Sequence, residues 1–112
     1  MKEAKILNDL YNFLKWILPI VAKYPRSYRF TLGTRIENCL YEIMEQLQRA
    51  YYVKQKRDSL DKSSLGIEHL RLLLRLSHEL HLFDQKIHYA IIQQLDGIGK
   101  QLGGWMKTLQ DN

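Results

Sequence analysis

The sequence predicts an all-α protein, an antiparallel up-down-up-down four-helix bundle. Three observations indicate this fold class. Apolar residues recur at spacings of three and four in four segments, about residues 2–23, 27–57, 64–81 and 85–109. The connections between these segments are short enough to make successive helices antiparallel. A chain of 112 residues can bury one hydrophobic core, so residues 1–112 are expected to form a single domain.

The first predicted helix, residues 2–23, has a continuous apolar face and contains a proline. The residues of this face follow one another at helical spacing: Ile6, Leu10, Phe13, Ile17 and Ile20. Pro19 lacks a backbone donor, and we expect it to bend the helix without interrupting it. Pro25 disfavours helical geometry at Tyr24, and Ser27 is a good N-cap, so the second helix is predicted to begin there.

The second and third predicted helices, residues 27–57 and 64–81, are separated by the longest polar run in the chain. This run, KQKRDSLDKSS from Lys54 to Ser64, is expected to be a loop, with Asp61, Ser63 and Ser64 as helix-starting residues. The third helix is apolar around so much of its circumference that it must pack on more than one side. It either lies centrally in the bundle or also faces another subunit, and the sequence leaves both possibilities open.

The fourth predicted helix, residues 85–109, begins after a tight connection in which Asp84 is the expected N-cap. Its second half contains a cluster of glycines, which each cost about 1 kcal/mol in a helix relative to alanine. Gly99 and Gly103 lie one turn apart and could allow close approach of a neighbouring helix, whereas Gly103 and Gly104 could instead fray the helix end. Periodicity does not choose between these alternatives.

The residues that could support catalysis are sparse, and we expect a non-enzymatic protein without a cofactor. Cys39 lies beside an apolar stripe and is predicted to be a buried small residue. His78 and His81 could share a helical face, but they lack a third ligand at suitable spacing, so no metal site is predicted. The chain also lacks a glycine-rich phosphate loop, a serine-elbow motif and an isolated pair of carboxylates.

The charge and hydropathy of the chain bear on its location and on its partners. The formal net charge is +5, which favours acidic partners such as nucleic acid. No segment is long and apolar enough to suggest a membrane span, and no secretory signal is visible. A single cysteine fits a reducing compartment, so we expect a cytoplasmic protein that does not associate with membranes.

Two pairs of arginines are the candidate binding residues. Arg71 and Arg75 lie one turn apart in a leucine-rich helix, where they could contact a phosphate backbone or the carboxylates of a partner. Arg26 and Arg29 stand among aromatic residues near the first connection. The alternative is a solvated helix face, on which Arg71 and Arg75 would pair with neighbouring glutamates. The residues alone leave both interpretations open.

Three motifs together resemble a known family. YPRSYRFTLGTRIE, LRLLLRLSHEL and the late GGWMK look like the accessory variability protein (Avd) of diversity-generating retroelements, and the resemblance extends over most of the chain. Four-helix proteins encoded within ribosomal RNA intervening sequences share the fold and part of the first motif.

The resemblance to the Avd family implies a function and a set of partners. It implies a non-enzymatic partner of a reverse transcriptase that assembles as a homo-oligomer, a pentamer, and binds RNA or DNA through a basic surface to support mutagenic reverse transcription. Under this resemblance Arg71 and Arg75 are the first candidates for that contact, followed by Arg26 and Arg29. The charge of +5 is modest for such a role, so binding would depend on several subunits acting together. The alternative is an interaction module of the intervening-sequence type that does not bind nucleic acid.

Overall fold

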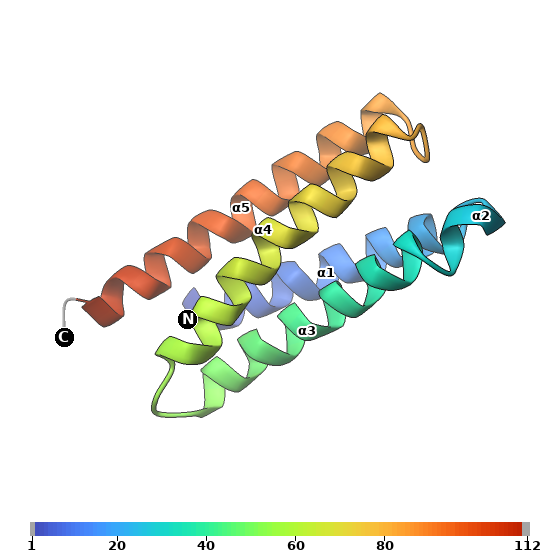
Figure 1. The fold of residues 1–112 in the computed structure, drawn as a ribbon. Helices are drawn as coiled ribbons and strands as arrows, with labels where there is room; N and C mark the ends of the chain where they lie inside the picture. The colour runs from blue at the N-terminus through green and yellow to red at the C-terminus, as the bar shows by residue number, and fades with distance from the viewer. Residues whose placement is uncertain (1, 111–112) are drawn as a thin grey trace.

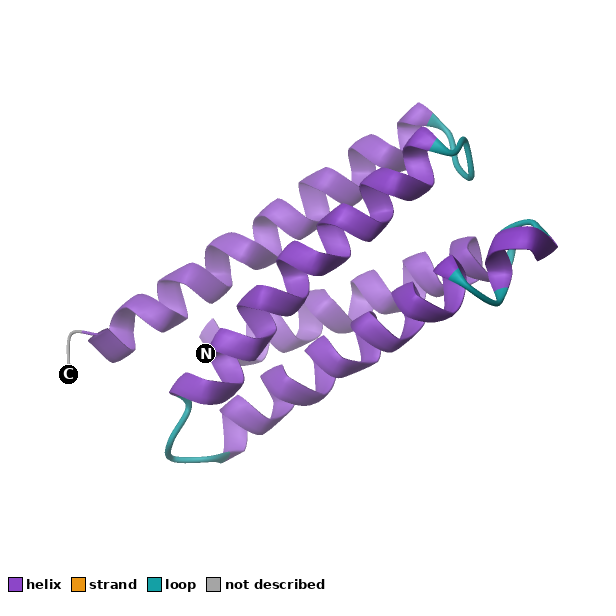
Figure 2. Ribbon diagram, in the orientation of Figure 1, coloured by secondary structure: helices purple, strands orange, loops and turns teal. Residues whose placement is uncertain are grey.

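The structure is a computed structural model that describes the backbone of residues 2–110 and the side chains of residues 4–109. The described residues form helices joined by loops and contain no strand, which confirms the all-α class (Figure 2). The elements are α1 (Lys2–Ala22), α2 (Arg26–Arg29), α3 (Leu32–Tyr52), α4 (Arg57–Glu79) and α5 (Gln85–Gln110).

The long helices pack in a closed cycle, in which α1 contacts α3, α3 contacts α4, α4 contacts α5, and α5 returns to α1. In Figure 1, α1 and α3 form one pair and α4 and α5 form another, and the short α2 lies at the end where α1 gives way to α3. The molecule is elongated, with principal extents of 47 × 24 × 20 Å. None of the described helices combines the length and the apolar character that crossing a bilayer requires.

The core consists of the apolar faces that the sequence predicts for the long helices. Its largest fully buried side chains come from α1, α3 and α4: Ile6, Leu10, Phe13, Ile17, Ile36, Leu40, Ile43, Leu47, Leu60, Ile67, Leu70 and Leu74. Helix α5 adds a buried row of its own: Ile91, Leu95, Ile98, Leu102 and Trp105. Pro19 lies inside α1, which continues to Ala22, so the expectation of an uninterrupted helix is confirmed.

The predicted helix 27–57 is wrong at both of its ends. Residues 26–29 form the separate helix α2, and the backbone leaves helical geometry at Thr31, where φ is −115° and ψ is −86°. The backbone N–H groups of Tyr28 and Arg29 both donate to the carbonyl of Pro25, and Ser27 is not the N-cap. At the other end α3 stops at Tyr52, where the Lys56 ammonium folds back and donates to the carbonyls of Ala50 (2.6 Å) and Val53 (2.7 Å).

The predicted loop over Lys54–Ser64 is wrong from residue 57 onward, because α4 begins there. Leu60 is fully buried, and Ser59 and Ser63 are buried beside it on the face that meets the core. The Ser63 hydroxyl donates to the carbonyl of Ser59 at 2.8 Å, which satisfies its hydrogen bonding inside the helix. Ser59 and Ser63 are therefore small core residues of the first turns of α4, and the predicted helix-starting residues Asp61, Ser63 and Ser64 all lie inside this helix.

The last connection agrees with the sequence prediction. Helix α4 ends at Glu79, α5 begins at Gln85, and His81 in the turn between them has a positive φ of 61°. The carboxylate of Asp84 accepts a hydrogen bond of 2.8 Å from the backbone N–H of Ile87, so Asp84 is the predicted cap.

Candidate nucleic-acid interface

Arg71, the first candidate, connects α4 to α5 at the surface of the subunit. Its guanidinium forms an ion pair with the carboxylate of Asp96 at 2.8 Å and donates to the carbonyl of Leu95 at 3.2 Å. A weaker contact of 3.5 Å joins it to Glu68 on the same helix. Gly99 makes room for this side chain, because a Cβ atom at position 99 would lie 3.1 Å from an Arg71 guanidinium nitrogen. Neither alternative for these glycines holds among the described residues: Gly99 meets the Arg71 side chain and no neighbouring backbone, Gly103 meets nothing within 4 Å, and α5 continues past Gly104 to Gln110.

Arg75 lies one turn further along α4 and is more accessible. Its side chain is 70% exposed and pairs with Glu79 at 2.9 Å. Both arginines therefore have intramolecular carboxylate partners, as the solvated-face alternative expects. Exposed ion pairs of this kind contribute little to stability and exchange readily, so Arg75 remains available to an external anion.

Arg26 and Arg29 are in a different environment on α2. Both are exposed, and within the described part of the chain neither takes part in an ion pair. The Arg29 guanidinium lies 5.6 Å from the ring centroid of Phe30, a side chain that is 68% exposed. We call Arg26, Arg29 and Phe30 the α2 corner. It presents two cations and a bare aromatic ring, a combination that suits the phosphates and bases of a single strand.

The two arginine pairs do not share neighbours. Helix α2 packs against α3, whereas Arg71 makes its contacts with α5. Figure 2 shows α2 at one end of the bundle, and the other pair belongs to α4. The two pairs of candidate residues thus lie on two different elements of the subunit, α2 and α4.

An apolar stripe on the outside of α4 accounts for the excess of leucine that the sequence shows. Its members are exposed, and the last of them caps the end of the helix: Leu65, Leu72, Leu76 and Leu80. Leu65 and Leu72 are 74% and 60% exposed, and Ile92 of α5 is 40% exposed. We call these four leucines the α4 leucine stripe. Of the two possibilities that the sequence left open, a helix fully enclosed by its own subunit does not hold for the described residues.

The histidines form a stack between α4 and α5. The rings of His78 and His88 lie 3.8 Å apart with an interplanar angle of 6°, and Phe83 stacks on both of them. Burial and the proximity of His78 lower the pKa of His88, and the charge of Glu79 opposes this shift. Sequence spacing could not find this pair, because its members lie on different helices. No group of three or more possible metal ligands gathers among the described residues.

Cys39 is buried, as the sequence predicts, and its thiol donates to the carbonyl of Gly66 at 3.4 Å. Burial, assisted by the charge of Glu42, raises the pKa of this thiol to about 11. The cysteine is therefore protonated at neutral pH, a state that is unsuited to nucleophilic chemistry.

These features define a small all-helical protein with an exposed apolar stripe and a basic corner. Residues 4–109 match the family model described as bAvd-like, and the chain belongs to this family of accessory proteins. The Avd resemblance of its motifs is thereby confirmed. No curated protein and no solved structure shows significant similarity to the chain.

Proposed function

We propose that this protein is the non-enzymatic accessory subunit of a diversity-generating retroelement. In this role it forms a cytoplasmic homo-oligomer of up-down-up-down bundles, a pentamer, and binds the reverse transcriptase together with template RNA or DNA through a basic surface. The observation that carries the proposal is the family match over residues 4–109. The α4 leucine stripe supports assembly, and the α2 corner supports binding of nucleic acid.

Assembly through the α4 leucine stripe is the first part of the proposal to test. Each leucine removed from water by a neighbouring subunit would contribute about 25 cal/mol per Å² of buried apolar surface. We expect the double variant Leu72→Glu with Leu76→Glu to be monomeric in multi-angle light scattering, whereas the unmodified chain gives the mass of five subunits. Tyr11→Glu is the matched control, since Tyr11 is 54% exposed on α1 and outside the stripe. A monomeric unmodified chain at micromolar concentration would count against the oligomer.

Binding of RNA is tested most cleanly at the α2 corner. Arg26 and Arg29 hold no described ion pair, so Arg26→Gln with Arg29→Gln removes charge and breaks only the exposed contact between Arg29 and the Phe30 ring. With a transcript of the retroelement template as probe, we expect roughly tenfold weaker binding or more, and a log–log salt slope smaller by about 0.7 for each lost phosphate contact. Lys15→Gln with Lys86→Gln removes the same charge elsewhere and should change affinity less.

Arg71 and Arg75 require a different experimental design. Replacing Arg71 by alanine breaks its contacts with Asp96 and Leu95 as well as any external one, so each binding measurement needs a thermal unfolding curve beside it. Arg75→Gln is the more direct probe, because its single described ion pair is exposed. Weaker RNA binding by Arg75→Gln at unchanged melting temperature would support a role for this helix face.

The alternative, a protein-interaction module that does not bind nucleic acid, is favoured by one observation. Arg71 and Arg75 already hold carboxylates of their own chain. A chain that binds a protein partner but leaves template RNA unbound at low salt would support this alternative. If neither the polymerase nor the RNA binds, the accessory role itself is wrong.

A further inference from the structure

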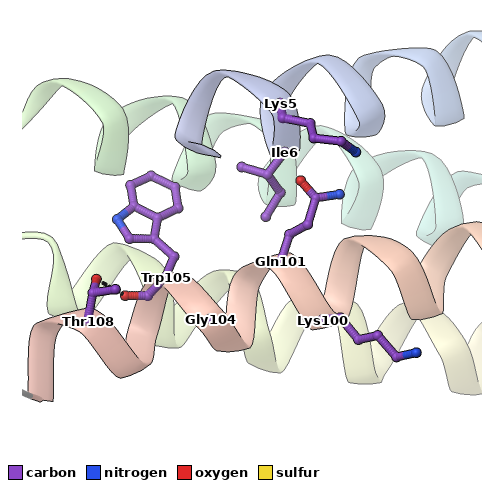
Figure 3. Close-up of a pocket in the computed structure, with 7 residues that line it drawn as sticks. All are labelled: Lys5, Ile6, Lys100, Gln101, Gly104, Trp105 and Thr108. Atoms are coloured by element: carbon purple, nitrogen blue, oxygen red, sulfur yellow. Dashed lines mark hydrogen bonds between the residues drawn. The ribbon is translucent and has the colours of Figure 1, made fainter. Parts of the chain in front are cut away.

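A hollow of about 360 Å³ lies between α1 and α5, on the side of the bundle away from the α3–α4 contact. Its lining residues come from both helices: Lys5, Ile6, Lys100, Gln101, Gly104, Trp105 and Thr108. Figure 3 shows Trp105 and Ile6 pointing into the space between the helices, while Lys5 on α1 and Lys100 on α5 both extend away from Trp105. We call this space the α1–α5 groove. Its volume falls at the lower end of the range of pockets that hold ligands.

The two ends of the groove differ in polarity. Near Trp105 the walls are the indole ring, Ile6 and the bare backbone of Gly104, so this end is apolar. The other end carries the ammonium groups, and the carboxylate of Asp9 accepts hydrogen bonds of 2.7 Å from both Lys5 and Gln101. Asp9 thereby neutralises Lys5, and Lys100 supplies the net positive charge at the rim. The side-chain oxygen of Gln101 is buried and has no hydrogen-bond partner among the described residues.

The hydrogen bond from Gln101 to Asp9 joins α5 to α1 at the end of this hollow, and a separate hollow follows along the same two helices. A second hollow of about 240 Å³ is lined by Asp9, Asn12, Gln93, Gln94, Gly97 and Ile98. A Cβ atom at Gly97 or at Gly104 would meet nothing within 4 Å, so the edge of α5 lacks side chains at both hollows. The α1–α5 groove, taken to include both hollows, is about 16 Å long from Gly97 to Thr108, which is about three helical turns. A small molecule would fill one hollow, whereas a helix would span both.

We propose that the α1–α5 groove binds an amphipathic, acidic helix of a partner protein. An apolar side chain of that helix packs over Gly104 against Trp105, and a carboxylate one turn away meets Lys100. Charge complementarity selects an acidic partner, since the net positive charge of the groove comes from Lys100 and the whole chain carries +5. The absence of side chains at Gly97 and Gly104 lets the backbone of the partner approach closely. The groove does not include the α4 leucine stripe or the α2 corner, so this inference does not depend on the proposed function.

The test uses the full chain and a defined probe. The probe is a fluorescein-labelled, alanine-based helical peptide of about 15 residues, with one phenylalanine and a glutamate four residues after it. Fluorescence anisotropy should give a saturable dissociation constant. Gly104→Leu fills the floor of the groove and should weaken binding roughly tenfold or more.

Gly103→Leu is the matched control, because Gly103 is also open around its Cβ position but does not line either hollow. It should bind the peptide like the unmodified chain. Lys100→Gln should weaken binding of the acidic peptide. It should not change binding of a peptide in which glutamine replaces the glutamate.

Three results would overturn the inference. The first is no saturable binding of the peptide by the unmodified chain. The second is equal loss of binding in Gly103→Leu and Gly104→Leu. The third is a change in the mass of the oligomer caused by Gly104→Leu and not by Gly103→Leu, since this would show that a second copy of the chain already occupies the groove.

Discussion

The contact between α3 and α4 and the contact between α1 and α5 use glycine in opposite ways. At the first, a Cβ atom on Gly66 would lie only 2.8 Å from Cγ1 of Ile43, and the thiol of Cys39 donates to the Gly66 carbonyl. At the second, Gly97 and Gly104 border hollows, and a Cβ atom on either would meet nothing within 4 Å. At Gly66 the Ile43 side chain fills the space that a Cβ atom would occupy, whereas at Gly97 and Gly104 that space is open.

This difference shows that a glycine within a helix has two separate uses. Each costs about 1 kcal/mol of helix stability relative to alanine. At Gly66 the packing of α3 against α4 within the subunit offsets that cost. At Gly104 nothing in the described subunit does so, and a compensating contact would have to come from outside. Substitution by alanine distinguishes the two uses directly.

Gly66→Ala should produce the largest effect. The added methyl group collides with Ile43, and overpacking of a close contact costs about 1–3 kcal/mol, of which the gain in helix propensity recovers only part. We expect the free energy of unfolding to fall by about 1.5 kcal/mol in urea titrations.

A double-mutant cycle with Ile43→Ala checks the cause of this loss. Removing the Ile43 side chain beyond Cβ deletes the atoms that collide, so Gly66→Ala should cost less in the Ile43→Ala background than in the unmodified chain. Additive effects would mean that the two helices are not in the close contact that the structure shows.

Gly104→Ala should have a smaller effect of the opposite sign. The new methyl group enters open space, so we expect the chain to gain about 0.5–1 kcal/mol of stability from helix propensity alone. Gly103→Ala is the matched control and should give the same gain. A loss of stability at Gly104 alone would contradict the open α1–α5 groove.

The sequence predicts the parts of this fold that repeat along one helix. The buried faces of α1 and α5 follow from spacings of three and four, and Asp84 follows from capping preferences. The sequence places the start of α4 too late, because polar residues such as Ser59 and Ser63 indicate a loop. Both serines are nevertheless buried, and the Ser63 hydroxyl donates to the Ser59 carbonyl within the helix, which amino-acid composition does not reveal.

The candidate site was less predictable, because its features depend on which helices are neighbours. Spacing indicated that Arg71 could pair with Glu68, but not that Asp96, on another helix, would be the closer partner. Likewise, four glycines near the end of the chain look alike in sequence, yet Gly99 receives an arginine and Gly104 faces open space.

The ends of α4 and α5 meet in a third kind of contact, the stack of His78 and His88. Among these predictions, the dependence of its stability on pH should be the smallest effect on the free energy of unfolding. The pKa of His88 in the folded chain lies below its ordinary value of 6.5, chiefly because of burial and then because of His78. Between these two values the unfolded chain binds more protons, so the free energy of unfolding should decrease as the pH falls below about 6.5. Above that range both states are neutral and the stack makes no pH-dependent contribution.

His88→Gln should flatten the dependence of stability on pH between about pH 7 and pH 5, as measured by urea unfolding at each pH. His81→Gln is the control, since His81 is exposed in the turn and outside the stack. Asp9 does not interfere in this range. Hydrogen bonds from Lys5 and then Gln101 hold its pKa below 3.8, so its contribution is lost only in stronger acid. An unchanged pH profile in His88→Gln would show that the α4–α5 end tolerates a charged imidazole. This end of the molecule would then be open to solvent, as the α1–α5 groove is.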